Sequence, residues 1–194
     1  MAISFLSEQG RFLARVEGPV SGNVLLRREQ YRRVDVPTAR VEIARGMVLA
    51  KITNCRTVLQ RATRDHDDKP GTEQIERAVR RLGILQEGIQ TERDLAVLRG
   101  REGDAANTYF EVMDHLITAQ KEDFFFRVRS RRPPLDNMNA LLSFTYTLLA
   151  HDASSALQAV GLDPQVGFLH ADRTNRSACG APPEDIRSDA AGLR

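Results

Sequence analysis

The chain has 194 residues and a formal net charge of +2, and 41% of its residues are hydrophobic and 28% are charged. These proportions are ordinary for a globular protein, and the length allows one domain or one domain with a small appendage. The N-terminal MAISFLSEQGRF has no basic or long apolar region, and no apolar run reaches membrane-spanning length, so neither a signal peptide nor a membrane-spanning helix is expected. We therefore expect a cytoplasmic protein, in which Cys55 and Cys179 are free thiols.

The N-terminal stretch ISFLSEQGRFLARV predicts a β-hairpin, with strands at residues 3–6 and 12–16 and a turn at Glu8-Gln9-Gly10. The EGPVSGN that follows it indicates a loop. A two-stranded hairpin alone is marginally stable. We therefore expect residues 1–36 to be the remnant of an N-terminal β domain and a linker, with part of that domain missing upstream.

Helical periodicity begins at about Pro37. Apolar residues at three- and four-residue steps predict a long helix that ends near DHDDKPG and a second helix after it. The inward positions are Val41, Ala44, Val48, Ile52, Cys55, Leu59 and Ala62, then Ile75, Val79, Leu82 and Leu85. The tetrad Thr91-Glu92-Arg93-Asp94 predicts a capping box that opens a short third helix through Leu98. Gly100 and Gly103 bracket the start of a fourth helix, whose inward face is Ala106, Tyr109, Met113 and Leu116.

A connector, KEDFFFRVRSRRPP, separates these helices from another long helix expected from Leu135 to Val160. GLDPQVGFLHADR then forms a short loop and an apolar stretch that ends at His170. Residues 174–194 lack periodicity and are rich in Gly, Pro, Ser and Asp, which is typical of a disordered tail. The sequence thus predicts a mainly α fold, with a helical domain at residues 37–173.

The chain contains no G-x-S-x-G, Walker, glycine-rich dinucleotide or H-E-x-x-H motif, so nothing supports nucleophilic or nucleotide-cofactor chemistry. Its basic residues are mostly arginines and occur in clusters, which are Arg27-Arg28, Arg32-Arg33, Arg80-Arg81 and the run Arg127, Arg129, Arg131 and Arg132. Guanidinium groups pair well with phosphate, but such clusters are also common on solvated helix faces. Charge alone leaves nucleic-acid binding and a solvated surface both open.

Two residues are candidate metal ligands. His170 closes an apolar stretch in a loop, where a side chain can be aimed at a pocket, whereas His66, His115 and His151 are more simply explained as surface or interior residues of helices. Glu102 lies in LRGREGDAANTYF, at the expected start of a helix. An acidic residue there interacts favourably with the helix dipole, so the residues alone favour an ordinary carboxylate over a metal ligand.

Three stretches taken together resemble the CRISPR-associated Cas-one family. LRGREGDAANTYF resembles the metal-binding signature of that family, and ARGMVLAKITNCRTVLQR resembles its first long helix. RRPPLDNMNALLSFTYTLLAHDASSALQAVGLDPQVGFLHADR resembles its central stretch and its histidine motif. The matches follow the order found in the family and cover the chain from about Ile3 to Arg173. They are most similar to the form found with type I-C systems.

The resemblance implies an all-α catalytic domain preceded by a small β domain. It implies a Mg²⁺ or Mn²⁺ ion held by Glu102, by His170 and by a further acidic residue. It also implies a homodimer that binds double-stranded DNA and works with a Cas-two family protein. The implied activity is that of a metal-dependent DNA endonuclease and integrase of CRISPR spacer acquisition, which joins the 3′-OH ends of captured DNA into the CRISPR repeat. The DNA backbone would then be contacted by Arg127, Arg129, Arg131 and Arg132.

The chain departs from the family at both ends. Most of the family's β domain precedes the point at which this sequence starts, and its third acidic ligand comes from a helix that follows the histidine. Here Glu184 and Asp185 stand at roughly the right distance, but they follow Pro182 and Pro183, which disfavour a helix. We therefore expect a chain truncated at both ends, with its third ligand unidentified and its catalysis weak. The alternative is a non-catalytic DNA-binding helical fragment.

Overall fold

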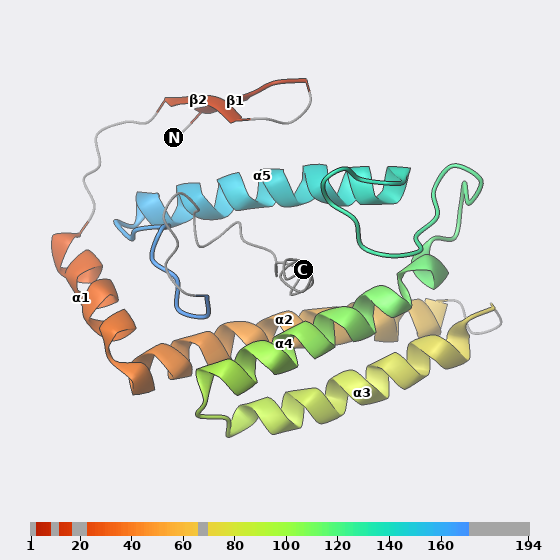
Figure 1. Cartoon of the computed structure of the whole chain (residues 1–194), viewed down its shortest axis with the longest axis horizontal. Helices are drawn as coiled ribbons and strands as arrows, with labels where there is room; N and C mark the ends of the chain where they lie inside the picture. Colours follow the sequence, from red (N-terminus) through yellow and green to blue (C-terminus); the bar gives the residue numbers. More distant parts are fainter. Residues whose placement is uncertain (1–2, 9–11, 17–22, 66–69, 171–194) are drawn as a thin grey trace, which may run out of the picture.

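The structure, a computed structural model, describes residues 3–8, 12–16, 23–65 and 70–170 and is mainly helical, which confirms the expected class. Its elements are β1 (Ile3–Leu6), β2 (Phe12–Val16), α1 (Val24–Asp35), α2 (Pro37–Asp65), α3 (Thr72–Gln90), α4 (Leu95–Glu111), the 3-10 helix η1 (Met113–Leu116) and α5 (Asn137–Ala159). In Figure 1, α2, α3 and α4 pack together, α5 runs above them, and the hairpin lies beyond α5. No helix in the described ranges has a stretch that is long and apolar enough to cross a bilayer.

The predicted hairpin strands are present at β1 and β2. The strands are antiparallel, with Ile3 opposite Val16 and Phe5 opposite Ala14. The apolar side chains of Ile3, Phe5, Leu13 and Val16 are exposed. The two strands are therefore paired, but these four apolar side chains are not covered. Part of the predicted turn and residues 174–194 lie outside the described residues.

Helix α1 lies where the sequence analysis expected a linker. Asn23 caps it, because its side-chain oxygen accepts hydrogen bonds from the N–H groups of Leu25 (3.0 Å) and Leu26 (3.3 Å). The helix buries Gln30 and Val34 rather than an apolar stripe, so hydrophobic periodicity gave no signal for it. The helical part of the chain thus begins before Pro37.

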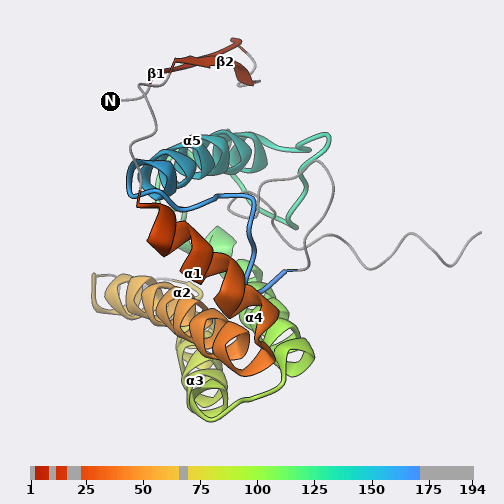
Figure 2. The same ribbon diagram turned by 90° about the vertical axis from the view of Figure 1, so that its left-hand side faces the viewer.

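The core lies between α2, α3 and α4. Five of the positions predicted for α2 are buried, namely Val41, Ala44, Val48, Ile52 and Leu59. Four of them, Ala44, Val48, Ile52 and Leu59, pack against a buried face of α3 formed by Ile75, Ala78, Leu82 and Ile89. Figure 2 shows α2, α3 and α4 from one end, with α1 in front of them and joined to α2. The buried α2 residues recur at steps of three, four and seven, which place them on one face of the helix and account for the close packing.

Helix α4 is one continuous helix, and the expectation of two helices separated by the glycines was wrong. Asp94 caps it by accepting hydrogen bonds from the N–H groups of Ala96 (2.6 Å) and Val97 (3.2 Å). The helix then runs through Gly100 and Gly103 without a break. Glycine weakens a helix but does not end it when the flanking residues pack well.

The buried face of α4 also differs from the prediction. Its buried residues are Leu98, Glu102, Ala105 and Thr108, whereas Ala106 and Tyr109 are only half-buried. Two polar residues, Glu102 and Thr108, interrupt this face. A prediction based on apolar residues alone therefore assigned the buried face to the wrong positions of the helix. Glu102 therefore lies in the middle of a helix on its packed side, not at a helix start.

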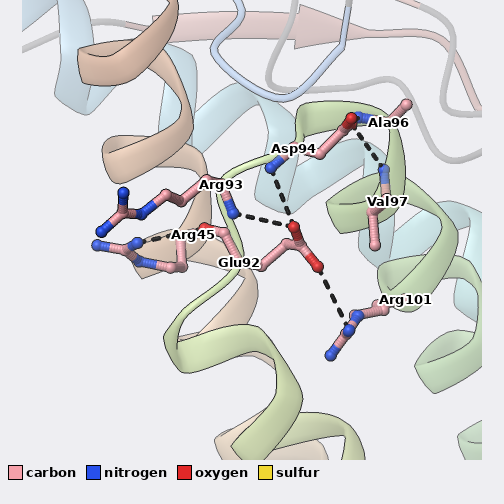
Figure 3. Close-up of polar contacts among 7 residues, drawn as sticks. All are labelled: Arg45, Glu92, Arg93, Asp94, Ala96, Val97 and Arg101. Carbon is pink, nitrogen blue, oxygen red and sulfur yellow. Dashed lines mark hydrogen bonds and ion pairs between the residues drawn. The ribbon is translucent and has the colours of Figure 1, made fainter.

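The turn between α3 and α4 is fixed by Glu92 (Figure 3). One oxygen of its carboxylate accepts hydrogen bonds from the N–H groups of Arg93 (2.9 Å) and Asp94 (3.0 Å), and the other pairs with Arg101 of α4 (3.3 Å). Arg45 of α2 donates to the Glu92 carbonyl (3.2 Å). The turn is thus held from both α2 and α4, which sets the direction in which α4 leaves it.

The predicted helix at residues 135–160 is present as α5. Asp136 caps it by accepting a hydrogen bond from the N–H of Asn139 (2.6 Å). Among the described residues of this helix only Asn139 is buried. Leu141, Phe144 and Leu149 are exposed, so α5 presents an apolar surface to solvent.

Gly100→Ala should raise the free energy of unfolding, whereas Gly88→Ala should leave it nearly unchanged. A Cβ on Gly88 would clash with Nη1 of Arg101, so Gly88→Ala has to move that guanidinium away from Glu92, and this cost of about 1 kcal/mol offsets a similar gain in helix propensity. A Cβ on Gly100 would meet no atom of a neighbouring described segment within 4 Å, so Gly100→Ala should stabilise by about 0.5–1 kcal/mol through helix propensity. Urea unfolding measures both; a destabilised Gly100→Ala would contradict the position of this glycine.

Candidate functional site

Glu102 is a buried carboxylate on the packed face of α4. Its side chain is only 7% exposed, and Leu98 and Ala105 lie on the same face, one turn to either side. A buried charge is costly unless an opposite charge or hydrogen-bond donors accompany it. This requirement separates Glu102 from Glu111 of the same helix, which is exposed.

Lys51 of α2 supplies the opposite charge. Its ammonium forms an ion pair and a hydrogen bond with Oε1 of Glu102. Lys51 itself is half-exposed, so one partner of the pair is in contact with solvent and the other is not. The pair therefore lies at the border between the core and the surface, where a small ion could reach the carboxylate.

A cavity of about 50 Å³ lies beside Lys51, between α2, α4 and α5. Its lining includes Lys51, Cys55, Ala105, Tyr109 and Tyr146. Burial raises the pKa of the Cys55 thiol, which the Lys51 ammonium lowers and the Glu102 carboxylate raises further. Burial also raises the pKa of Tyr109. The thiol and the phenol therefore remain neutral at pH values around 7, and neither supplies an anionic oxygen or sulfur to a cation.

His170 ends a segment that two arginines hold against the helical layer. Arg40 of α2 donates three hydrogen bonds of 2.8–3.3 Å to carbonyl groups of residues 167–170, the carbonyl of His170 included. Arg99 of α4 donates one of 2.6 Å to the carbonyl of Leu169. Irregular backbone needs such partners because it lacks those of a helix or sheet.

These hydrogen bonds bring the two candidate residues to the same region. Arg99 precedes Glu102 by three residues, so it belongs to the adjacent turn of α4. Phe168 and Leu169 pack against the core formed by α2, α3 and α4. Figures 1 and 2 both show the segment after α5, drawn in blue, descending toward α2 and α4. The backbone of His170 thus lies beside the part of α4 that carries Glu102.

The donor chemistry of this region suits a divalent cation. Glu102 offers a carboxylate and His170 an imidazole, and the Lys51 ammonium shows that the carboxylate attracts a cation. Within the described ranges no cluster of three or more His, Cys, Asp or Glu side chains could hold a metal ion. Glu184 and Asp185, which the sequence offered for the third position, lie outside those ranges.

His115 and its neighbour Asp114 have structural roles. Asp114 accepts a hydrogen bond from the N–H of Phe126 (2.8 Å) and pairs with Lys121 (3.1 Å). Burial raises the pKa of Asp114, but these two partners lower it below its ordinary value. The ring of His115 lies so close to Gly71 that a Cβ there would be 2.3 Å from Nδ1. These contacts join η1 to the connector and to the start of α3.

The four arginines predicted to contact DNA are not equivalent. Arg127 and Arg132 are exposed, and Arg131 is half-exposed. Arg129 is turned inward, where it donates to the side chain of Asn139 (2.8 Å) at the start of α5. Burial lowers the pKa of Arg129. The structure thus gives Arg129 an internal partner that the sequence did not reveal.

Arg40→Met should loosen the segment that carries His170 without unfolding the helices. Three hydrogen bonds from a charged donor are lost, so chymotrypsin should cleave after Phe168 about tenfold faster or more. Arg45→Met is the matched control, because Arg45 is a half-buried arginine of the same helix that holds Glu92 instead. Equal cleavage rates after Phe168 in the two variants would contradict this role of Arg40.

The chain matches the family described as CRISPR associated protein Cas1 over residues 1–180. It is 49% identical over 176 residues to the CRISPR-associated endonuclease Cas1 1 of Chlorobaculum tepidum, a match that covers 91% of this chain and 51% of that protein. It is 52% identical over 180 residues to the CRISPR-associated endonuclease Cas1 2 of Rhodospirillum rubrum, covering 91% of this chain and 52% of that protein. The chain spans about half the length of the curated relatives it matches.

Solved structures share its fold. A Cas1 protein from Thermotoga maritima is 24% identical, with a TM-score of 0.70 over 92% of this chain and 53% of that one. A partial Cas6-RT-Cas1–Cas2 complex is 26% identical, with a TM-score of 0.69 over 92% of this chain and 52% of that one. A casposase bound to integration product is 25% identical, with a TM-score of 0.69 over 92% of this chain and 48% of that one. The chain therefore belongs to the Cas1 family of CRISPR-associated proteins, the Cas-one family whose motifs its sequence contains.

Proposed function

We propose that this chain carries the metal-dependent DNA endonuclease and integrase activity of CRISPR spacer acquisition, which joins the 3′-OH ends of captured DNA into the CRISPR repeat by phosphoryl transfer. The observation that carries the proposal is the buried Glu102, paired with Lys51, beside the segment that ends at His170. Relatives named as endonucleases support the nuclease activity. A casposase bound to integration product, which has a similar fold, supports the joining reaction.

Glu102 and His170 would hold a Mg²⁺ or Mn²⁺ ion, which neutralises charge on a phosphate group and so lowers the barrier to displacement at phosphorus. Glu102 contributes a negative charge from a rigid position, because the packing of α4 prevents its side chain from turning away. His170 contributes a nitrogen donor from a segment whose backbone Arg40 and Arg99 fix. The chain thus prepares both donors before the substrate arrives.

Three arginines of the connector, two of them exposed and one half-exposed, are proposed to contact the DNA backbone. Arg127, Arg131 and Arg132 follow one another in the connector before α5, and guanidinium groups neutralise phosphates without reading the sequence. Arg129 contributes indirectly, because its hydrogen bond to Asn139 joins the connector to α5. Affinity for DNA should therefore fall steeply with salt, as it does wherever counter-ions are released.

We further propose that the active assembly is a homodimer that binds double-stranded DNA in the cytoplasm together with a Cas2-family protein. The fold shared with a Cas6-RT-Cas1–Cas2 complex supports the Cas2-family partner. The assignment to a type I-C-like form rests on the similarity of the sequence motifs and belongs to the same proposal.

The second candidate function is DNA binding without catalysis. The observation that favours it is the number of metal donors, because the described residues provide Glu102 and His170 but no cluster of three. Two donors hold a divalent cation loosely, with the remaining positions filled by water or phosphate oxygens. A metal ion held this loosely leaves catalysis weak in the first candidate function and absent in the second.

Glu102→Gln and His170→Ala should each reduce Mn²⁺-dependent cleavage of double-stranded DNA by about 100-fold or more, because each removes a proposed ligand. A gel assay with end-labelled DNA measures the cleavage. Glu111→Gln and His115→Ala are the matched controls, since they alter an exposed carboxylate of α4 and a histidine of η1. Wild-type cleavage in both ligand variants would contradict the site.

DNA binding, measured by fluorescence anisotropy, distinguishes the two candidate functions. Integrase activity predicts metal-dependent cleavage in the wild-type chain and unchanged DNA affinity in Glu102→Gln. Tight binding with no cleavage by the wild-type chain at saturating Mn²⁺ would instead support the non-catalytic fragment.

A further inference from the structure

The cationic partner of Glu102 is half-exposed to solvent. Lys51 of α2 forms the ion pair, and the exposed fraction of the side chain is 46% for Lys51 but 7% for Glu102. We propose that Lys51 is a displaceable counter-ion, which neutralises Glu102 in the metal-free protein and is released when a divalent cation binds this carboxylate. The inference rests on the proposed function, because it takes Glu102 as a ligand of the cation.

The metal-free fold needs a cation at Glu102, and α2 is the element that provides it. Removing one partner of a buried pair leaves an uncompensated charge, which is strongly destabilising. The two arginines that flank Glu102 on α4 have other partners. Arg101 pairs with Glu92 (3.3 Å), and Arg99 donates to a backbone carbonyl of the segment after α5 (2.6 Å). Lys51 therefore reaches Glu102 across the interface between two helices and stabilises their contact.

Lys51 is also suited to leave. Lysine carries a compact charge on a flexible four-carbon stem, and the exposed half of this side chain can move into water without opening the core. A divalent cation at Glu102 would stand close to the ammonium, and charges repel each other more strongly in partly buried surroundings than in water. An arginine at this position would hold the carboxylate through two parallel hydrogen bonds and resist displacement.

The site then holds one cation at Glu102 at all times, first the ammonium and afterwards the metal ion. Competition with the ammonium lowers the apparent affinity of Glu102 for the metal, while the same ammonium stabilises the metal-free fold. Removal of Lys51 should therefore change two properties in opposite directions. Metal should bind more tightly, and the metal-free protein should unfold more easily.

The test compares Lys51→Met and Lys51→Arg with the wild-type chain. Mn²⁺ titrations at near-neutral pH are followed by the electron paramagnetic resonance of the free ion. Lys51→Met should bind Mn²⁺ about three- to fivefold more tightly, the ratio expected from the loss of a half-exposed ion pair. Without metal its melting temperature should fall, and Mn²⁺ should raise it more than in the wild type. Lys51→Arg should bind Mn²⁺ more weakly than the wild type.

Two further variants make the outcome decisive. Lys121→Met is the matched control, because it breaks the Lys121–Asp114 ion pair at η1 (3.1 Å) and should leave Mn²⁺ affinity unchanged. If Glu102→Gln loses Mn²⁺ affinity while Lys51→Met binds no more tightly than the wild type, the ligand role stands and the counter-ion role is overturned. If Glu102→Gln keeps wild-type affinity, the ligand role in the proposed function is overturned and the counter-ion role with it.

Should Lys51→Met fail to fold, Lys51→Arg decides the question, since it keeps the positive charge on a side chain of similar length. Weaker Mn²⁺ binding by Lys51→Arg supports displacement of the side chain, and unchanged or tighter binding overturns it.

Discussion

The ion pair between Lys51 and Glu102 joins α2 to α4 near the middle of both helices. The packed face of α4 has Leu98 and Ala105 on either side of Glu102, so an apolar residue would fit this position in a purely structural helix. A carboxylate is stable there only because α2 presents Lys51 at the matching turn. The packing of α2 against α4 therefore depends on this ion pair.

A second set of interactions links this interface to the segment after α5. Arg27 and Gln30 of α1 bind the backbone of residues 161–163, and Arg40 and Arg99 bind that of residues 167–170. Side chains from three helices thus supply the hydrogen bonds that this irregular backbone cannot make within itself. Several arginines of this chain therefore have structural roles, so its arginine content overstates the number of guanidinium groups that are free to face a partner.

The sequence predicted the helices whose buried faces are apolar and missed the features that depend on polar residues. Val48, Ile52 and Leu59 repeat at helical spacing, so the position of α2 followed directly from the pattern. Helix α1 was missed because it packs through Gln30 and other polar side chains. The inward face of α4 was misplaced because Glu102 interrupts it, although the spacing of Leu98, Glu102 and Ala105 was visible in the sequence.

The setting of His170 in a loop made it a candidate from the residues alone, but Glu102, and the pairing of the two as metal ligands, came from the resemblance to a family. Neither the burial of Glu102 nor its pairing with Lys51 can be read from the order of residues, because the two lie 51 positions apart and meet only when α2 packs on α4. The inward turn of Arg129 was equally hidden, since its partner Asn139 lies on the next helix. Contacts between residues of different structural elements are thus the part of this site that could not be predicted from the sequence.

Joint binding of a divalent cation by Glu102 and His170 is tested most directly by a crystal structure of the chain with Mn²⁺, measured where manganese scatters anomalously. One strong anomalous peak is expected at about 2.0–2.4 Å from an oxygen of Glu102 and a nitrogen of His170, with the Lys51 ammonium moved away from the carboxylate. At saturating Mn²⁺, a crystal structure with no anomalous peak at Glu102 and with the Lys51–Glu102 ion pair intact would contradict the metal site. It would also contradict the function that is proposed from that site.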